Sequence, residues 1–255
     1  MNINEYPILE FDEDKNAFIK PANIIQPIDI PVKCVLCFFA DAIEKLLLEY
    51  PHKIVATIKS ESFKLPVYEI NYKGERIALM QAGVGAPIAA AQLEELIAFG
   101  CRKFIACGGC GVLRKEIAVG HLIIPTAAVR DEGTSYHYVK PSREITANTS
   151  VVSVIENTLA ALKAPYIKVK TWTTDAIYRE THAKIKRRKD EGCVTVEMET
   201  AAFIAVSQFN NVAFGQILYA GDNLGGDEWD RRGFDSRADI REAVLKIALD
   251  VCLNL

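Results

Sequence analysis

Two carboxylates flank a methionine within the apolar stretch CVTVEMETAAFIAV, residues 193–206. Burying a carboxylate without a partner costs on the order of several kcal/mol, so Glu197 and Glu199 must each hold something. If a helix begins near Glu199, its free N–H groups and its dipole are enough to explain that carboxylate. Alternatively, the carboxylate binds two neighbouring hydroxyls, as on a ribose, while Met198 packs beneath the sugar. Spacing alone leaves both interpretations open.

A third carboxylate, Asp222, lies between small residues in the stretch ILYAGDNLGG, residues 217–226. An aspartate in this position could simply cap the turn that follows, by accepting hydrogen bonds from nearby backbone N–H groups. It could also act as a general acid that protonates a leaving group. The residue type and its place after an apolar run agree with either role.

Two glycine-rich stretches, QAGVGAP (81–87) and ACGGCGVL (106–113), also follow apolar runs. A chain without Cβ atoms lets a ligand approach the backbone and offers N–H donors to an anion. Gly83, Gly108 and Gly109 are therefore candidates for a phosphate-binding turn. Neither stretch has the dinucleotide fingerprint or the P-loop spacing, and tight turns without a ligand would explain them equally.

The elements that must position these residues alternate between strand and helix. Residues 1–32 are rich in Pro and Asn and predict an irregular N-terminal arm. Apolar runs predict strands over 32–40, 53–58, 67–72, 76–83, 103–109, 121–130, 166–172, 194–197 and 212–222, and helical periodicity predicts helices over 41–50, 86–100, 149–163, 180–191 and 238–253. Asp41 is the expected N-cap of the first of these helices. Residues 33–255 should form one α/β domain, a three-layer α/β/α sandwich around a central mixed, mostly parallel twisted sheet.

Composition excludes several classes of protein. Half of the 255 residues are hydrophobic, a quarter are charged and the formal net charge is −3, which is typical of a soluble globular protein and offers no basic surface for nucleic acid. No apolar run is long enough to cross a membrane. Seven cysteines in mostly apolar settings and an N-terminus without signal-peptide features predict the cytoplasm. The CGGC of residues 107–110 has no second pair and no nearby His, so no metal site is predicted.

Taken together and in this order, the motifs resemble the nucleoside phosphorylase superfamily, which holds purine nucleoside phosphorylases, uridine phosphorylases and the methylthioadenosine nucleosidases. The likeness spans about 33–253, with VEMETAA and the downstream GDN as its most specific parts. GVGAP, GGCGVL and VGHLIIPTAAVRDEGTSYHY agree best with the uridine phosphorylase branch. The resemblance implies an enzyme that cleaves the N-glycosidic bond of a nucleoside, works without a cofactor, and forms a homo-oligomer, a dimer or a hexamer.

The resemblance also implies a role for each motif residue. Glu199 would bind the ribose 2'- and 3'-hydroxyls, and Met198 would pack against the sugar. Asp222 would be the catalytic acid that acts on a purine base. The residues expected around the base are Cys110, Gly111, Ile177, Val196 and Glu197, with Ile177 in a place usually aromatic. Thr181 and Ala183 replace the Gln and Arg with which uridine phosphorylases clamp a pyrimidine, so a purine-like base is favoured, although Arg179 is close to these positions.

The second substrate is less well matched. Family phosphorylases hold phosphate with three arginines, and this chain has FFADA (38–42), Ala106 and Phe63 or Lys64 at the corresponding places. An arginine fork is the usual way to bind an oxyanion, so either phosphate or water remains open as the acceptor, as does a nucleoside-binding protein without activity. The hydrolytic members use a glutamate in this region, but neither Asp41 nor Glu44 aligns with it cleanly.

A final stretch, GGDEWDRRGFD (225–235), is expected to be a loop over the pocket. Trp229 and Phe234 are its candidate lid contacts. In the purine phosphorylases an arginine downstream assists the acid, and Arg231, Arg232 or Arg237 could do so here.

Overall fold

Apolar runs of the chain become the strands of one mixed sheet. The computed structural model describes residues 4–233 and 236–255, and in this part of the chain the strand order is β10-β6-β8-β9-β5-β1-β4-β3-β2, with β7 beside β6. The strands are β1 (Lys33–Cys37), β2 (His52–Lys59), β3 (Lys64–Tyr72), β4 (Glu75–Gln81), β5 (Lys103–Val112), β6 (Leu122–Asp131), β7 (Glu144–Thr146), β8 (Tyr166–Thr174), β9 (Cys193–Glu197) and β10 (Ala213–Asn223). Strands β3 and β4 are joined by a tight turn at Lys73 and Gly74, whose φ angles are 50° and 87°.

The sheet curls back on itself at one end. Strand β10 pairs in parallel with β5 and antiparallel with β6, so that β5, β9, β8, β6 and β10 follow one another around a closed ring. The predicted mixed sheet is confirmed: among the described strands five pairings are parallel and five antiparallel, and the two longest, β5 with β10 and β6 with β8, are parallel. Between Ala220 and Asn223 of β10 the register against β5 shifts, because three steps along β10 match two along β5. Asp222 lies within this β-bulge.

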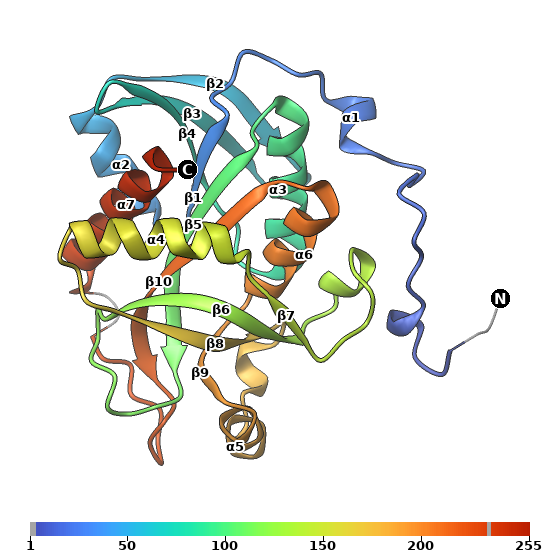
Figure 1. Ribbon diagram of the computed structural model, residues 1–255, viewed down its shortest axis with the longest axis vertical. Helices are drawn as coiled ribbons and strands as arrows, with labels where there is room; N and C mark the ends of the chain where they lie inside the picture. Colours follow the sequence, from blue (N-terminus) through green and yellow to red (C-terminus); the bar gives the residue numbers. More distant parts are fainter. Residues whose placement is uncertain (1–3, 234–235) are drawn as a thin grey trace.

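Helices cover both faces of the sheet, which confirms the three-layer prediction (Figure 1). The helices are α1 (Pro21–Ile24), α2 (Ala40–Glu49), α3 (Ala86–Phe99), α4 (Thr149–Ala161), α5 (His182–Asp190), α6 (Thr200–Asn210) and α7 (Ala238–Leu253). Alternate residues of β1 point to opposite faces: Val35 packs in the core under α2, α4 and α7, and Leu36 in the core under α3 and α6. Both cores are almost entirely apolar, so the sheet is a rigid platform for the loops at its edge.

Local chemistry sets where the helices begin and end. Helix α3 has a proline in its first turn and ends at Gly100, whose φ of 135° is strained for any residue with a Cβ. Helix α2 corrects one prediction, because its N-cap is Phe39 and Asp41 lies in the first turn, where its Oδ1 accepts a hydrogen bond from the Ala42 amide at 3.0 Å. Helix α6 begins directly after Glu199, which is its N-cap.

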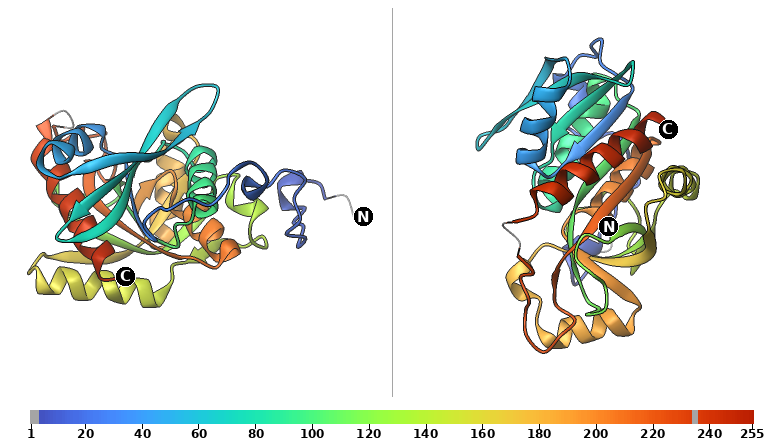
Figure 2. Two further views of the ribbon diagram at one scale, coloured as in Figure 1. Left: turned by 90° about the horizontal axis from the view of Figure 1, so that it is seen from above. Right: turned by 90° about the vertical axis from the view of Figure 1, so that its left-hand side faces the viewer.

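Residues 4–32 run along one side of the body with only two short helical turns, Pro7–Leu9 and α1 (Figure 2). Most of these side chains are exposed, including Phe18 and Ile19. Lys15 attaches the segment to the body, since its Nζ donates to the carbonyl of Phe209 at 3.1 Å and lies 5.0 Å from the centre of that ring. The prediction of an irregular N-terminal arm describes this segment.

Within residues 4–233 and 236–255, no helix has the length and apolar character needed to cross a membrane. The seven cysteines are free thiols and are buried. In the same residues, no cluster of His, Cys, Asp and Glu could hold a metal ion.

Candidate active site

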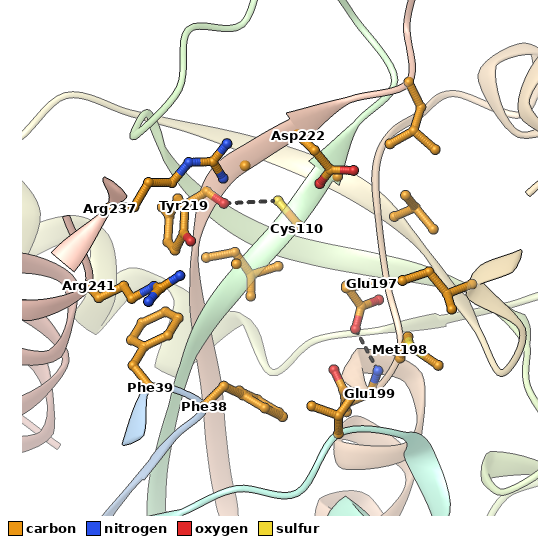
Figure 3. Close-up of a pocket in the computed structure, with 18 of the residues that line it drawn as sticks. Phe38, Phe39, Cys110, Glu197, Met198, Glu199, Tyr219, Asp222, Arg237 and Arg241 are labelled. Atoms are coloured by element: carbon orange, nitrogen blue, oxygen red, sulfur yellow. Dashed lines mark hydrogen bonds between the residues drawn. The ribbon is translucent and has the colours of Figure 1, made fainter. Parts of the chain in front are cut away.

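A cavity of about 610 Å³ opens at the carboxyl ends of β1, β5, β9 and β10. This is the edge of an α/β sheet where ligands usually bind. Figure 3 shows Asp222 at one end of the cavity and Glu199 with Met198 at the other. The predicted site residues that line it are Gly109, Cys110, Gly111, Ile177, Val196, Glu197, Met198, Glu199 and Asp222. Gly83 and Gly108 are not among its lining residues.

Glu199 is the buried N-cap of α6, and its side chain reaches across to the loop after β4. Its Oε1 accepts a hydrogen bond from the Gly85 amide at 2.6 Å. Burial, and then the charge of Glu197, raise the pKa of Glu199 to about 8. In the described residues the carboxylate makes no ion pair, and it lies at the wall of the cavity. The Glu199 side chain therefore stands at the start of a helix without accepting hydrogen bonds from its amides, and it faces the cavity.

Glu197 is the neighbouring buried carboxylate, and its oxygens are bound to the protein. Its Oε1 accepts a hydrogen bond from the Thr173 hydroxyl at 2.7 Å. Its Oε2 accepts hydrogen bonds from the amides of Glu199 at 2.7 Å and Thr200 at 2.6 Å. These contacts make Glu197 the acceptor that holds the first turn of α6 and fixes the backbone of Glu199, while Glu197 also lines the cavity.

We predict that Glu197→Ala lowers the free energy of unfolding by about 2–3 kcal/mol, since two buried amides and a hydroxyl lose their acceptor. Urea denaturation would measure the change. Glu61→Ala, in an exposed turn, is the control and should stay within about 0.5 kcal/mol of the wild type. A Glu197 variant as stable as the control would show that α6 does not depend on this acceptor.

The end of the cavity opposite Glu199 contains Asp222, whose Oδ2 accepts a hydrogen bond from the Trp229 indole at 2.7 Å. A Cβ built on Gly111 would lie 2.6 Å from Leu224 and 3.5 Å from the other Asp222 oxygen, so glycine is required there. Ile177 lines the same end and is half exposed. The loop contact predicted for Trp229 is thus with the acid itself, and Phe234 lies outside the described residues.

Residues 34–253 match the sequence model of the phosphorylase superfamily. The chain belongs to this family. It is 27% identical over 188 residues to guanosine phosphorylase of Halorubrum lacusprofundi, covering 70% of this chain and 76% of that one. It is 26% identical over 186 residues to a DeoD-type purine nucleoside phosphorylase of Aliivibrio fischeri, covering 72% and 77%. A crystal structure of uridine phosphorylase from Vibrio fischeri ES114 superposes with a TM-score of 0.77 at 22% identity, covering 89% of this chain and 93% of that chain.

Membership of the phosphorylase superfamily confirms the predicted family, and with it an enzyme of the pentosyltransferase or related N-ribosyl hydrolase kind. The superposition confirms the predicted α/β fold. The role of each site residue is inferred from its contacts and position in this chain.

The glycine turns differ from the arrangement predicted for a phosphate-binding turn in this superfamily. The Gly83 amide already donates to Gln92 Oε1 at 2.8 Å. A Cβ on Gly108 would lie 2.9 Å from the Phe38 ring, so this ring packs closely against the glycine. Gly109 packs against the Tyr219 ring in the same way. These glycines permit close packing, and the amide of Gly83 is not free for an anion.

Two arginines line the cavity. The family motifs did not predict either of them as an anion ligand. Arg237 and Arg241 come from the start of α7 (Figure 3). Arg241 Nη1 lies 2.9 Å from Asp41 Oδ2. Arg237 donates hydrogen bonds to the carbonyls of residues 231 and 232 and thereby holds the loop that precedes α7. Of the three arginines considered as helpers of the acid, only Arg237 lines the cavity.

Sequence reasoning also missed Glu180, which lines the cavity from the loop between β8 and α5. Burial, and then the charge of Asp222, raise the pKa of Glu180 to about 7, against an opposing effect of Lys184. A signal was present in the sequence, because Glu180 follows a predicted strand by a few residues, as the other candidates do.

Proposed function

We propose that the protein cleaves the N-glycosidic bond of a nucleoside with a purine-like base. The observation that carries this proposal is the position of Glu199, a buried carboxylate without an ion pair in the described residues, at the wall of a cavity that also contains Asp222. A carboxylate can accept hydrogen bonds from two adjacent hydroxyls, which suits the ribose diol. Met198 would pack against the sugar, and Cys110, Gly111, Ile177 and Val196 would surround the base.

Asp222 would act on the base, on which negative charge builds as the bond to the ribose breaks. As the C1'–N bond breaks, positive charge builds on the ribose and negative charge on the departing base. Hydrogen bonding or proton transfer from the protein to the base stabilises this transition state more than the ground state. The relatives named guanosine phosphorylase and purine nucleoside phosphorylase support a purine-like base, as does the loss of the pyrimidine clamp at Thr181 and Ala183.

Phosphate is the acceptor we propose first, giving free base and ribose 1-phosphate. The names of the relatives and the two cavity arginines, Arg237 and Arg241, support it. Water is the second candidate, favoured by the Gly83 amide, which is bound to Gln92. Hydrolysis would need no anion subsite.

The acceptor can be identified by incubating the enzyme with inosine, adenosine, guanosine and uridine, with and without phosphate. Formation of ribose 1-phosphate, dependent on phosphate, is the expected result. Free ribose formed equally well in both conditions would establish hydrolysis in its place. Calorimetric binding of a nucleoside without base release over long incubation would contradict catalysis altogether.

The pKa of Glu199 predicts how the diol is bound. Below about pH 8 the protonated side chain offers fewer acceptor sites, and above it the carboxylate can accept from both hydroxyls. The preference for adenosine over 2'-deoxyadenosine should therefore grow as the pH rises through about 8. Competition assays between the two nucleosides across this range would measure it. A preference independent of pH would argue against a direct contact between Glu199 and the 2'-hydroxyl.

A further inference from the structure

Glu180 differs from the other carboxylates of the cavity because its side chain has no protein partner. Glu197, Glu199 and Asp222 each accept a hydrogen bond from an N–H or O–H group. In the part of the chain that the structure describes, the Glu180 carboxyl makes neither a hydrogen bond nor an ion pair, although it is half-buried. A buried polar group without a partner costs free energy, so such a group in a cavity is suited to contact a ligand.

Asp222 is the charged neighbour that matters most for Glu180. The two groups line the same cavity from different elements, β10 and the loop before α5, and no hydrogen bond joins them. The negative charge of Asp222 disfavours ionisation of Glu180 in this mostly apolar cavity. Lys184, the only cation among the causes of the Glu180 pKa shift, is also 3.4 Å from Asp131.

Other ionisable groups face the cavity from the remaining elements. They are Asp41 of α2, Cys110 of β5, Glu197 of β9, Glu199 at the start of α6, and Arg237 and Arg241 of α7. None of them contributes to the pKa of Glu180 as much as burial and Asp222 do. The base end of the cavity therefore has a pair of carboxyl groups of which one can keep a proton near neutral pH.

We propose that Glu180 contacts the base and supplies the proton that the base takes when it leaves, with Asp222 as the neighbouring carboxylate that lines the same cavity. The inference rests on the proposed N-glycosidic cleavage. In the step, the C1'–N bond breaks and its electron pair goes to the base, while the Glu180 O–H proton moves to a base nitrogen. An oxygen of the acceptor bonds to C1', and the proton that the acceptor loses returns through solvent to Glu180.

The first test is the dependence of kcat on pH. Because Glu180 must be protonated to act, wild-type kcat should fall as the pH rises through about 7. Glu180→Gln should lower kcat by roughly 100-fold and abolish this fall. Asp222→Asn should shift the fall to lower pH in the activity that remains, because it removes the charge that raises the pKa of Glu180. Glu61→Gln, on an exposed turn, is the control and should match the wild type.

A second substrate separates proton donation from a structural role. In 7-methylguanosine the purine already carries a methyl group and positive charge at N7, so the base can leave without a proton there. Glu180→Gln should cleave 7-methylguanosine at close to the wild-type rate while losing roughly 100-fold on guanosine. An equal loss on both nucleosides, or a wild-type pH profile in the variant, would overturn the proposal. If the wild-type enzyme released no base from either nucleoside, the proposed function itself would fail, and this inference with it.

Discussion

Replacing Glu199 by Gln is expected to lower kcat/KM for a ribonucleoside by roughly 10–100-fold above about pH 8, where the side chain of the wild type is a carboxylate. A hydrogen bond to a charged acceptor contributes about 1.5–3 kcal/mol, and the amide keeps only one of the two acceptor oxygens. The new NH₂ group would also meet a donor, either the Gly85 amide or a ribose hydroxyl. Steady-state kinetics on inosine and guanosine would measure the loss.

The same variant should not be less stable, which separates loss of binding from loss of folding. The pKa of Glu199 is raised in the folded protein, so the stability that the protonated group provides is lost as the pH rises through about 8. Glutamine carries no charge and should lack this loss, giving a free energy of unfolding equal to or above that of the wild type at alkaline pH. Glu116→Gln, on an exposed loop, serves as the matched control. Full activity in the Glu199 variant would exclude it as the ribose ligand.

Asp222→Asn is expected to lower kcat on purine nucleosides by about 10²–10⁴-fold, the usual contribution of a group that assists proton transfer. Asparagine has the shape of aspartate and can still accept from the Trp229 indole, so the loop should keep its position. KM should change much less than kcat, because the effect belongs to the transition state. Single-turnover measurements of base release would separate this step from product release.

The control for this prediction is Asp227→Asn, an exposed aspartate on the same loop, which should behave as the wild type. Near-normal rates in Asp222→Asn would remove Asp222 from the reaction. They would leave Glu180 as the single carboxyl acting on the base.

The fold could be predicted from the sequence because its signals are local. Buried strands such as β5 and β10 are continuous apolar runs, and the helices carry periodic apolar residues. Closure of the sheet could not be predicted in this way. The pairing of β10 with β6 joins Leu218 to Ile123, residues far apart in the chain with no pattern that singles out the contact. Which strands pair, and in which direction, depends on such contacts between distant parts of the chain.

Site residues could be predicted where one short stretch of sequence determines their position. They could not be predicted where the site forms between segments that are distant in the sequence. Glu199 and Met198 follow a strand and begin a helix, so their place at the sheet edge was readable from the stretch itself. Glu180 becomes a candidate site residue because it lines the same cavity as Asp222, which is distant in the sequence. Arg241 reaches the cavity because α7 packs beside the first strand. The hydrogen bonds that Glu197 accepts from the amides of Glu199 and Thr200 could not be predicted from the residue types.

The β-bulge in β10 makes the identity of the acid depend on the length of the chain. In a regular strand successive side chains alternate between faces, and the extra residue between Ala220 and Asn223 resets that alternation just where Asp222 reaches the cavity. Deleting one residue there would present a different side chain to the cavity while the paired residues before Ala220 kept their register. An insertion or deletion at this point would therefore change which side chain lines the cavity, and with it the specificity, while the strand pairings before Ala220 stayed the same.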